Sequence, residues 1–575
     1  MTTETKSPPF PTLEDWQHWT WVMGRAQQML MEAWAENLKK DEPFPGFTPA
    51  TAADPMAWMT AGAEAWSKGL EAWGKMLGAN AETGQRKDRR FASPDWSENP
   101  VFDTIKESYL AISERLLGSV EEMEGIDEDT RQKLRFATKG FVDAMSPSNF
   151  ALTNPEVMKR TIETKGENLL SGLKNMLDDI RRGQLSQTKA GAFEVGRNLA
   201  TTPGKVIFEN ELYQLIHYAP TTETVLETPV VIFPPWINRF YILDLTPEKS
   251  FVRWCVDNGI SLFMVSWKSA DESLAHVRLD DYILKGQLDA IDRIRGLLGV
   301  EDVHAVGYCV AGTTLAATLA YLAAKGEAKV KSATFLTAQV DFSEAGDLKL
   351  FLGDETMALL DQVTKDKGYL DGRYMAATFN LLRGRDLIWS YVVNNYLLGQ
   401  EPTPFDLLHW NGDVTNLPAG WHRDYLETLY KANKLVEKGG ITVAGVPIDL
   451  HQVAIPAYIQ AGREDHIAPP QSVWKIMHHF TGDKRFVLAG SGHIAGVVNP
   501  PAAGKYQYWT NDDDAGSLDE FIAGATEHKG SWWPDWLSWT RKLAPKEVPA
   551  KGARIPGKGN LKAIEDAPGR YVKAR

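Results

Sequence analysis

Residues 303–314 constrain the fold of this chain more than any other stretch. They read as a short apolar strand, an abrupt Gly-x-Cys-x-Ala-Gly turn and the start of an Ala/Leu-rich helix that runs to about Ala324. A turn of this kind presents one side chain, here Cys309, on a tight corner between small neighbours. The free N–H groups and positive dipole at a helix start favour a thiolate and any oxyanion beside it. We therefore predict that Cys309 is a nucleophile at a strand-to-helix corner.

From residue 206 onward, apolar runs of strand length alternate with stretches of helical pattern. The strand-like runs are residues 230–233, 262–265, 303–306, 333–336, 455–459 and 486–488, and the runs at 206–208 and 212–218 are spaced as a hairpin. The helical stretches include residues 247–258, 279–298 and 311–324. This alternation predicts a mostly parallel sheet covered by helices on both faces. With the corner at Cys309, it predicts an α/β-hydrolase fold.

The chain of 575 residues is longer than one core ordinarily supports, so we expect two domains. Residues 1–200 read as a mainly helical N-terminal domain, and residues 201–575 read as the catalytic domain. Between about 339 and 446 the alternation stops, and aromatic residues with short helical runs predict a cap or lid. From about residue 551, a segment rich in lysine, arginine and glycine predicts a flexible basic tail.

Charge and cysteine content argue against several functions. The formal net charge of −13 speaks against nucleic acid as the main partner, because phosphate binding needs clustered positive charge. Two cysteines are too few for a disulfide framework or a cysteine-based zinc site, so we expect a reducing cytoplasm and no metal centre. No export signal is visible at the N-terminus. Residues 305–324 are uncharged, but glycines and threonines interrupt them, so we expect no membrane span.

The first two hundred residues contain eight tryptophans, more than a small helical layer usually needs for packing. Trp66, Leu70, Trp73 and Leu77 fall on one helical face, at spacings of i, i+4, i+7 and i+11. Such stripes serve either as ordinary core or as exposed faces that meet a partner subunit or an amphiphilic surface. The sequence leaves both roles open.

The residues after two later strands complete a catalytic set with Cys309. In an α/β-hydrolase the nucleophile, acid and histidine occur in that chain order, each on a loop that follows a strand. Here Asp465 lies in the polar loop 461–469, and His493 lies at the centre of the glycine-lined loop 489–496. Order and placement agree, with the cap between nucleophile and acid. We predict that Cys309, Asp465 and His493 form a catalytic triad.

Neighbouring residues offer alternatives that we consider weaker. Glu464 could replace Asp465 as the acid, and His466 could replace His493 as the base, but each is next to a better-placed residue. Cys255 lies in a helical stretch and reads as an inert core thiol. His304, in the strand before the corner, reads as a structural histidine.

An oxyanion hole requires backbone N–H groups from two loops. One donor is expected from Val310, which directly follows the nucleophile. The other is expected after an early strand, where Phe233-Pro-Pro-Trp-Ile-Asn238 is found. An N–H near Trp236 or Ile237 would serve, and we assign it to Ile237. The alternative is a purely structural turn.

Cysteine at such a corner suits acyl transfer between thioesters. A thiolate attacks a carbonyl and forms a thioester on the enzyme. If the substrate is itself a thioester, such as an acyl-coenzyme A, the exchange is nearly balanced in energy and the acyl group stays activated for transfer to an alcohol. Some lactone hydrolases also use a cysteine at this position, so hydrolysis remains an alternative.

A set of motifs from about Phe141 onward resembles the bacterial polyhydroxyalkanoate synthases. The motifs are Ser146-Pro-Ser-Asn-Phe150 with Asn154-Pro-Glu156, Phe233-Pro-Pro-Trp-Ile-Asn238 with Tyr241-Ile-Leu-Asp-Leu245, Gly307-Tyr-Cys-Val-Ala-Gly312, Trp389-Ser-Tyr-Val-Val-Asn-Asn-Tyr396, Pro404-Phe-Asp-Leu-Leu-His-Trp-Asn-Gly-Asp413, Gly462-Arg-Glu-Asp-His-Ile467 and Gly490-Ser-Gly-His-Ile-Ala-Gly496. One departure is Ala311, where many members of this family have glycine. Alanine is small enough that we expect the helix packing to survive.

The resemblance implies a reaction in which (R)-3-hydroxyacyl-CoA monomers, expected to be 3-hydroxybutyryl-CoA, are joined into a polyester with release of CoA. It implies that Cys309 is the nucleophile, that His493 activates it, and that Asp465 helps to deprotonate the incoming 3-hydroxyl. CoA is then part of the substrate, and no cofactor is implied. Arg383 matches a family arginine near the CoA phosphates, although a solvated or ion-paired arginine is an equal reading.

The resemblance also implies an assembly and a location. The length and N-terminal region resemble the single-subunit class that uses short-chain monomers. The family suggests a homodimer on the surface of cytoplasmic polyester granules, with the granule and its surface proteins as partners. Two other readings stay open, namely a cysteine hydrolase of lactones or esters and a non-catalytic granule-surface protein.

Overall fold

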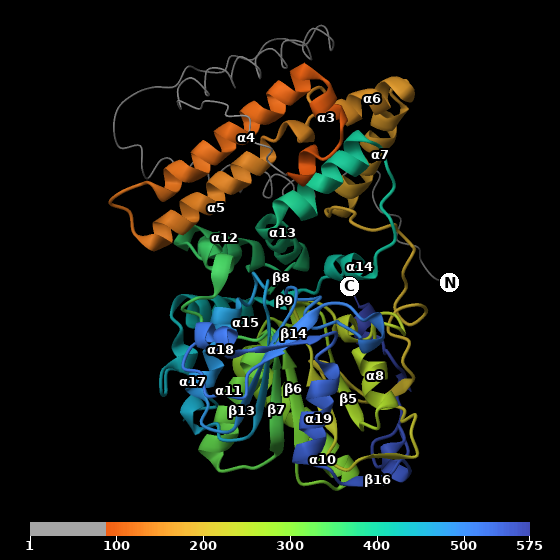
Figure 1. Cartoon of the computed structure of the whole chain (residues 1–575). Helices are drawn as coiled ribbons and strands as arrows, with labels where there is room; N and C mark the ends of the chain where they lie inside the picture. The colour runs from red at the N-terminus through yellow and green to blue at the C-terminus, as the bar shows by residue number, and fades with distance from the viewer. Residues whose placement is uncertain (1–87, 575) are drawn as a thin grey trace. The chain divides into compact units, whose positions relative to one another are not determined.

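The computed structural model describes residues 88–574, and its contacts divide the chain into two compact units (Figure 1). The first unit is Met1–Lys189 with Ala376–Thr403, described from Asp88 onward, and the second is Ala190–Met375 with Pro404–Arg575. The division falls earlier than the expected boundary at residue 200, and it assigns part of the insertion at 339–446 to the first unit. The tryptophan stripe at 66–77 lies outside the described residues.

Helices of the first unit begin where the sequence supplies a capping side chain. Helix α4 (Pro100–Glu121) follows Asn99, whose side chain accepts from the Val101 N–H at 2.9 Å. Helix α5 (Glu128–Ala144) follows Asp127, which caps it in the same way. The two helices pack together, and the Tyr109 hydroxyl donates to the Val142 carbonyl between them. The other described α-helices before residue 190 are α3 (Asp95–Glu98), α6 (Pro155–Glu163) and α7 (Glu167–Arg182).

Part of the insertion packs on helix α7 and so belongs to the first unit. Its π-helical segments are η7 (Arg385–Trp389) and η8 (Val392–Leu397). The Asn168 side chain donates to the Leu397 carbonyl at 2.8 Å. Gly172 allows the close approach of the two segments, since a Cβ there would lie 1.7 Å from the Tyr396 carbonyl oxygen. This long-range contact explains why the insertion does not belong wholly to the catalytic unit.

The second unit is built on a sheet of eleven strands, in the order β15-β14-β13-β12-β7-β6-β4-β5-β2-β1-β17. The strands are β1 (Gly204–Glu209), β2 (Tyr213–Tyr218), β4 (Val230–Phe233), β5 (Leu262–Trp267), β6 (Val303–Tyr308), β7 (Val330–Leu336), β12 (Ala457–Gly462), β13 (Lys484–Ala489), β14 (Gln507–Thr510), β15 (Thr526–Lys529) and β17 (Glu565–Asp566). The six strands from β13 to β5 run parallel, and the pairs beyond them are antiparallel. The predicted hairpin is confirmed as β1 and β2.

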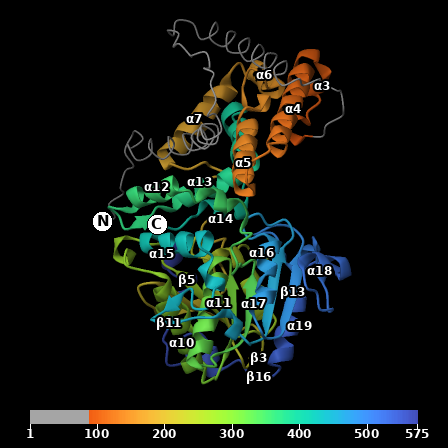
Figure 2. The same cartoon turned by 90° about the vertical axis from the view of Figure 1, so that its left-hand side faces the viewer.

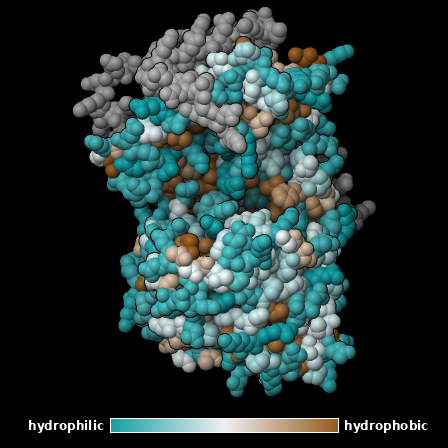
Figure 3. Space-filling model, viewed as in Figure 1, coloured by the Kyte–Doolittle hydropathy of each residue, from teal (hydrophilic) through white to brown (hydrophobic). Residues whose placement is uncertain are grey.

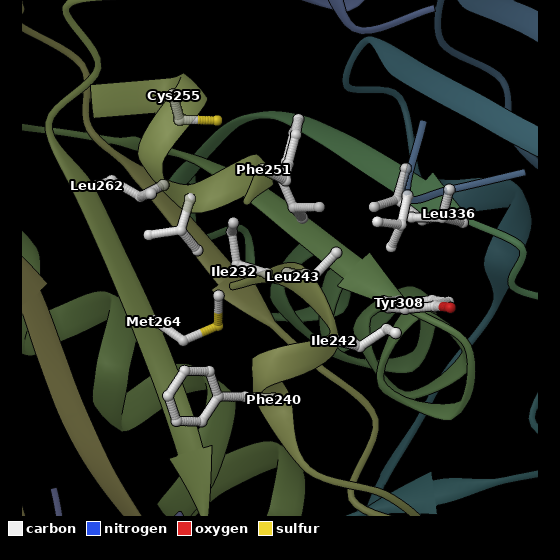
Figure 4. Close-up of a cluster of buried hydrophobic side chains, with 14 of the residues drawn as sticks. Ile232, Phe240, Ile242, Leu243, Phe251, Cys255, Leu262, Met264, Tyr308 and Leu336 are labelled. Carbon is white, nitrogen blue, oxygen red and sulfur yellow. The ribbon is translucent and has the colours of Figure 1, made fainter. Parts of the chain in front are cut away.

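Helices cover both faces of this sheet, as predicted (Figure 2). On one face lie α8 (Phe251–Asp257) and α19 (Trp533–Leu543), where the rings of Phe251 and Trp533 are 4.9 Å apart. On the other face lie η5 (Tyr282–Leu288), α10 (Asp289–Leu298) and α11 (Val310–Lys325). An apolar cluster between the sheet and α8 includes Ile232, Met264 and Leu336 (Figure 4). These layers hold the carboxyl ends of the parallel strands at one edge, where ligand sites of such sheets are found.

The part of the insertion that belongs to the second unit consists of short elements. They are η6 (Gly346–Phe351), α12 (Asp354–Thr364), β8 (Tyr369–Leu370), α14 (Asp406–Gly412), β9 (Leu417–Pro418), α15 (Ala419–Asp424), η9 (Tyr425–Lys431), η10 (Lys434–Val436) and β10 (Thr442–Val443), while α13 (Gly372–Leu382) crosses the division between the units. The short elements agree with the prediction of short helical runs in this region.

On the face shown in Figure 3, hydrophilic residues cover most of the second unit and apolar residues are scattered. Large apolar side chains are instead buried, including Trp236, Trp421 and Trp536. In the described part of the chain, no helix has both the length and the apolar character needed to cross a bilayer. Within residues 88–574, no cluster of three or more His, Cys, Asp or Glu side chains is placed to hold a metal ion.

The C-terminal segment from Lys551 is a folded part of the second unit, so the prediction of a flexible tail was wrong. Strand β17 pairs with β1 and extends the sheet. The buried Arg554 guanidinium donates to the carbonyls of Leu226 and Glu227. Composition was misleading here because basic side chains of this segment bind specific acceptors of the folded unit.

His217 on β2 is a buried imidazole that should make stability depend on pH. Its ring is stacked on Phe263 with centroids 4.2 Å apart, and neither ring nitrogen has a hydrogen-bond partner in the described structure. Burial, together with the positive charge of Arg554, lowers the pKa of His217 to about 3. A histidine in an unfolded chain titrates near 6.5. Between these pH values the unfolded chain binds a proton that the folded chain does not, so stability falls as pH drops below about 6.5.

We expect the substitution His217→Phe to remove this contribution. Between pH 7 and pH 5, the unfolding free energy of the variant should fall by about 2 kcal/mol less than that of the parent chain, because one titration is lost. Urea unfolding followed by tryptophan fluorescence at the two pH values measures the difference. The exposed His478 gives a control, since His478→Gln should keep the parental pH dependence. An unchanged pH dependence in His217→Phe would contradict a neutral buried imidazole.

Candidate active site

Cys309 lies on a sharp corner between strand β6 and helix α11, which begins at Val310. Its backbone has φ of 53° and ψ of −127°, a conformation that residues with a side chain rarely adopt. The Cys309 N–H donates to the Leu336 carbonyl on the neighbouring strand at 3.0 Å. A strained residue between strand and helix is the mark of a nucleophile elbow. The predicted strand, turn and helix are confirmed.

Two glycines let the strand and the helix close together behind Cys309. A Cβ on Gly307 would lie 2.5 Å from the Gly312 Cα, and a Cβ on Gly312 would lie 2.4 Å from the Ala338 Cβ. Ala311, the departure from the family motif, is fully buried within α11, and its carbonyl accepts from the Gln287 side chain at 2.9 Å. The helix therefore accommodates the extra methyl group, as expected.

Asp465 and His493 lie on loops that follow the neighbouring strands β12 and β13. The His493 Nδ1 and an Asp465 carboxylate oxygen are 2.7 Å apart. The other carboxylate oxygen accepts from the N–H groups of Ile467 and Ala468 at 2.8 and 2.9 Å. The Asp465 side chain is fully buried and that of His493 is 9% exposed, so the fold fixes both. The structure thus brings the predicted acid and base together.

The alternative acid and base occupy different surroundings. Glu464 is exposed on the same loop, and its backbone N–H donates to the Ser491 carbonyl at 3.0 Å. His466 is partly exposed, whereas His493 is held against Asp465. The geometry therefore favours Asp465 and His493 over their neighbours.

His493 also interacts with Cys309. Burial alone would lower the pKa of His493, but the negative charges of Asp465 and Cys309 and hydrogen bonds to both raise it to about 10. His493 is therefore close enough to Cys309 to exchange a proton with it. Because Nδ1 is bonded to Asp465, Nε2 is the ring nitrogen that remains for Cys309. Cys309, His493 and Asp465, the three residues of the predicted triad, thus form one connected set.

The loop 234–239, called the β4 loop below, lies beside the corner at Cys309. Strand β4 pairs with β6 so that Phe233 is opposite Gly307, and the segments after both strands leave the same edge of the sheet. Trp236 is fixed by stacking on Tyr282, with ring centroids 4.1 Å apart. The buried Ile237 follows it, and its carbonyl accepts from the Thr415 N–H. This placement fits the predicted use of the Val310 and Ile237 N–H groups as oxyanion donors.

Two tyrosines near Cys309, the buried Tyr430 and the half-buried Tyr425, were missed by the sequence reasoning. Tyr425 and Tyr430 both belong to η9, and their rings are 5.3 Å apart. Burial above all, with the negative charge of Cys309 among the further causes, raises the pKa of both hydroxyls. They therefore stay protonated and can donate hydrogen bonds near the Cys309 sulfur. The aromatic richness of the insertion was the only sequence signal, because no spacing relates these residues to Cys309.

Three other residues considered in the sequence, Arg383, Cys255 and His304, are each held by an ion pair, by burial or by a hydrogen bond. Arg383 belongs to the first unit, is half exposed and forms an ion pair with Asp386 at 2.6 Å, which matches the ion-paired reading. Cys255 is fully buried, and burial raises the pKa of its thiol well above the ordinary value, as expected for an inert core thiol. His304 Nδ1 and the Ser332 hydroxyl are 2.7 Å apart within the sheet, as expected for a structural histidine.

The sheet, the strained corner and the acid–histidine pair define a protein of the α/β-hydrolase fold, and the family model described as alpha/beta hydrolase fold matches residues 229–500. The model described as poly-beta-hydroxybutyrate polymerase (PhaC) N-terminus matches residues 87–255. A poly(3-hydroxyalkanoate) polymerase of Methylorubrum extorquens is 49% identical over 85% of this chain and 81% of its own length. The PhaC subunits of the corresponding polymerases from Rhizobium meliloti and Cupriavidus necator are each 46% identical, over 89% and 88% of this chain and 83% and 86% of their own lengths.

This chain therefore belongs to the poly(3-hydroxyalkanoate) polymerase family, as the sequence motifs indicated. It is an acyltransferase that polymerises hydroxyalkanoates. The reading of the chain as a non-catalytic protein is thereby excluded.

Proposed function

We propose that the chain polymerises (R)-3-hydroxyacyl-CoA, with 3-hydroxybutyryl-CoA as the expected monomer, through a polyester thioester on Cys309. The observation that supports this mechanism most directly is the strained corner that presents Cys309 to His493, with Asp465 bonded behind the imidazole. CoA enters as part of the substrate, and no separate cofactor is needed.

In the acylation step, His493 Nε2 takes the thiol proton of Cys309, and the sulfur attacks the thioester carbonyl of the monomer. The oxyanion that forms accepts hydrogen bonds from the N–H groups of Val310 and Ile237. The carbon–sulfur bond to CoA then breaks, and the CoA thiolate takes the proton from His493. The products are an acyl thioester on Cys309 and free CoA. Because one thioester replaces another, the acyl group stays activated.

In the elongation step, the 3-hydroxyl of an incoming monomer attacks the thioester carbonyl on Cys309. His493 takes the hydroxyl proton, and the negative charge of Asp465 stabilises the imidazolium that forms. An ester bond forms, and Cys309 leaves as a thiolate. The thiolate then attacks the CoA thioester of the lengthened acyl group, the carbon–sulfur bond to CoA breaks, and the CoA thiolate takes the proton from His493. The chain grows by one unit per cycle and returns to Cys309 each time.

We further propose that the protein works as a homodimer on the surface of cytoplasmic polyester granules, where granule-surface proteins are its neighbours. The insoluble product and the many apolar residues of the N-terminal region support this location. Arg383 is proposed to reach the CoA phosphates in the working enzyme. Its guanidinium would then exchange Asp386 for phosphate, a stronger bidentate partner.

An assay with 3-hydroxybutyryl-CoA tests this function. CoA release with insoluble polymer, seen as free thiol and turbidity, is the expected result. CoA release with soluble 3-hydroxybutyrate would instead indicate a cysteine hydrolase, and no release would contradict the proposal for this monomer. Turnover of four-carbon and longer 3-hydroxyacyl-CoA monomers in parallel then defines the chain-length preference.

A further inference from the structure

Arg239, which ends the β4 loop, is buried and binds two separate parts of the second unit, the insertion and the C-terminal segment. Its side chain is 1% exposed, and Nε donates to Asp413 at 2.7 Å. Two further N–H groups of the guanidinium donate to the carbonyls of Val572 and Ala574, each at 2.8 Å. A buried guanidinium requires such acceptors, because an unsatisfied buried charge is costly. The last residues of the chain thus complete the surroundings of a cation on the loop beside Cys309.

The residues that bind Arg239 from the insertion are themselves fixed to the β4 loop. Asp413 accepts a second hydrogen bond, from the Tyr241 hydroxyl at 2.8 Å. The indole of Trp410 donates to the Arg239 carbonyl at 2.6 Å, and Asn238 forms a β-bridge with Val414. The insertion and the C-terminal segment therefore both bind the end of the β4 loop at Arg239.

The C-terminal segment has its own anchors, so it can hold the arginine in place. The Tyr571 hydroxyl donates to the Asn210 carbonyl at 2.7 Å, and the Tyr571 N–H donates to the Gln214 side chain at 3.1 Å. Val572 is 2% exposed and belongs to the apolar cluster of the second unit. These contacts fix residues 571–574 against the hairpin of β1 and β2.

The position of the β4 loop matters because Ile237 is two residues before Arg239. An oxyanion donor works only when its N–H lies about 2.7–3.1 Å from the developing charge, and loss of one donor costs about 10²- to 10³-fold in rate. A small displacement of the loop therefore reduces acyl transfer while leaving the thiol and the imidazole in place.

We propose that residues Tyr571–Ala574 are a positioning element of the active site, which holds the oxyanion loop in its productive geometry through the guanidinium of Arg239. The inference rests on the proposed function, because it takes the β4 loop as the source of an oxyanion donor. In this proposal, residues 571–574 affect the rate of acyl transfer and not only the stability of the folded chain.

A shortened chain that ends at Gly569 tests this proposal. Single-turnover acylation of Cys309 by 3-hydroxybutyryl-CoA should slow at least about tenfold, with the substrate concentration at half-maximal rate changed less than threefold. Alkylation of Cys309 by iodoacetamide should keep its parental rate, because that reaction forms no oxyanion. Tyr571→Ala removes one anchor and keeps the backbone carbonyls. Its acylation rate should fall by a smaller factor, and its alkylation rate should again stay at the parental value.

Lys562→Ala is the control. Lys562 is an exposed basic residue of the same segment and its ammonium donates to the Gly559 carbonyl, so both rates should stay within about twofold of the parent. Equal loss of acylation and alkylation in the shortened chain would show a general structural role and overturn the proposal, as would parental acylation. Failure of both test variants to fold would overturn it too. If Cys309 of the parent chain is not acylated at all, the proposed function fails. That outcome differs from failure of the positioning proposal, in which the parent chain is acylated normally.

Discussion

Replacement of Cys309 by alanine is expected to abolish both CoA release and polymer formation from 3-hydroxybutyryl-CoA. The loss should be at least about 10⁴-fold, the scale seen when the nucleophile of a triad enzyme is removed, because the acyl group then has no sulfur at the corner on which to form a thioester. The second cysteine cannot replace it, since Cys255 is fully buried in α8 and packs in the apolar cluster beneath the sheet. Free-thiol detection with turbidity measures both activities.

Cys255→Ala provides the control for this prediction. The substitution removes one buried sulfur, which should cost about 1–2 kcal/mol of stability and leave turnover within about twofold. Iodoacetamide should label Cys309 in the folded parent chain and leave Cys255 unlabelled until the chain unfolds, as read by peptide mass. Normal turnover in Cys309→Ala would mean that a different group carries the polyester, and the proposed mechanism would be withdrawn.

Local sequence patterns were enough to predict the corner, the sheet and the order of the candidate site. The strand, turn and helix around Cys309 are contiguous in sequence. The spacing of Gly307 and Gly312 is therefore enough to predict the close approach that the structure shows between them. Asp465 and His493 could be placed because each follows an apolar strand directly, and the ends of parallel strands meet at one edge of the sheet. In each case the information lies within about ten residues.

Features that depend on contacts between distant residues were missed. The tail from residue 551 looked flexible because its composition is basic, yet Arg554 is buried against carbonyls more than three hundred positions earlier. The insertion looked like one cap, but Gly172 and Tyr396 tie part of it to the first unit. Tyr425 and Tyr430 approach Cys309 only through the folding of the insertion. Periodicity and spacing describe single elements, so they contain no signal for such pairings.

The same distinction between local pattern and long-range contact applies to the β4 loop. The sequence predicts its place, directly after β4, but not what holds it there. Its support comes from Asp413 and from residues 572–574, which bind the same guanidinium. Residues far from the β4 loop in sequence therefore hold it through Arg239.

Asp465→Asn is expected to separate acylation from elongation. The negative charge of Asp465 is the largest influence that raises the pKa of His493, while burial lowers it, so the pKa of His493 should fall in the variant. A less basic imidazole still suffices to deprotonate a thiol, because thiols are stronger acids than alcohols, and the first acylation should slow by about tenfold or less. The incoming 3-hydroxyl is a much weaker acid, so its deprotonation should collapse by about 10³- to 10⁴-fold, as for loss of the acid in other triads.

The experiment is a rapid-mixing measurement of CoA release by the Asp465→Asn chain. A burst of up to one CoA per Cys309 followed by almost no further release is the expected trace, whereas the parent chain continues to turn over. Glu464→Gln, at the exposed neighbour, should behave like the parent and so controls for a change of loop charge. If burst and steady rates fall by the same factor, Asp465 serves mainly to orient His493, because a misplaced imidazole would impair both proton transfers alike. A normal steady rate would exclude Asp465 from the reaction, despite its 2.7 Å contact with His493.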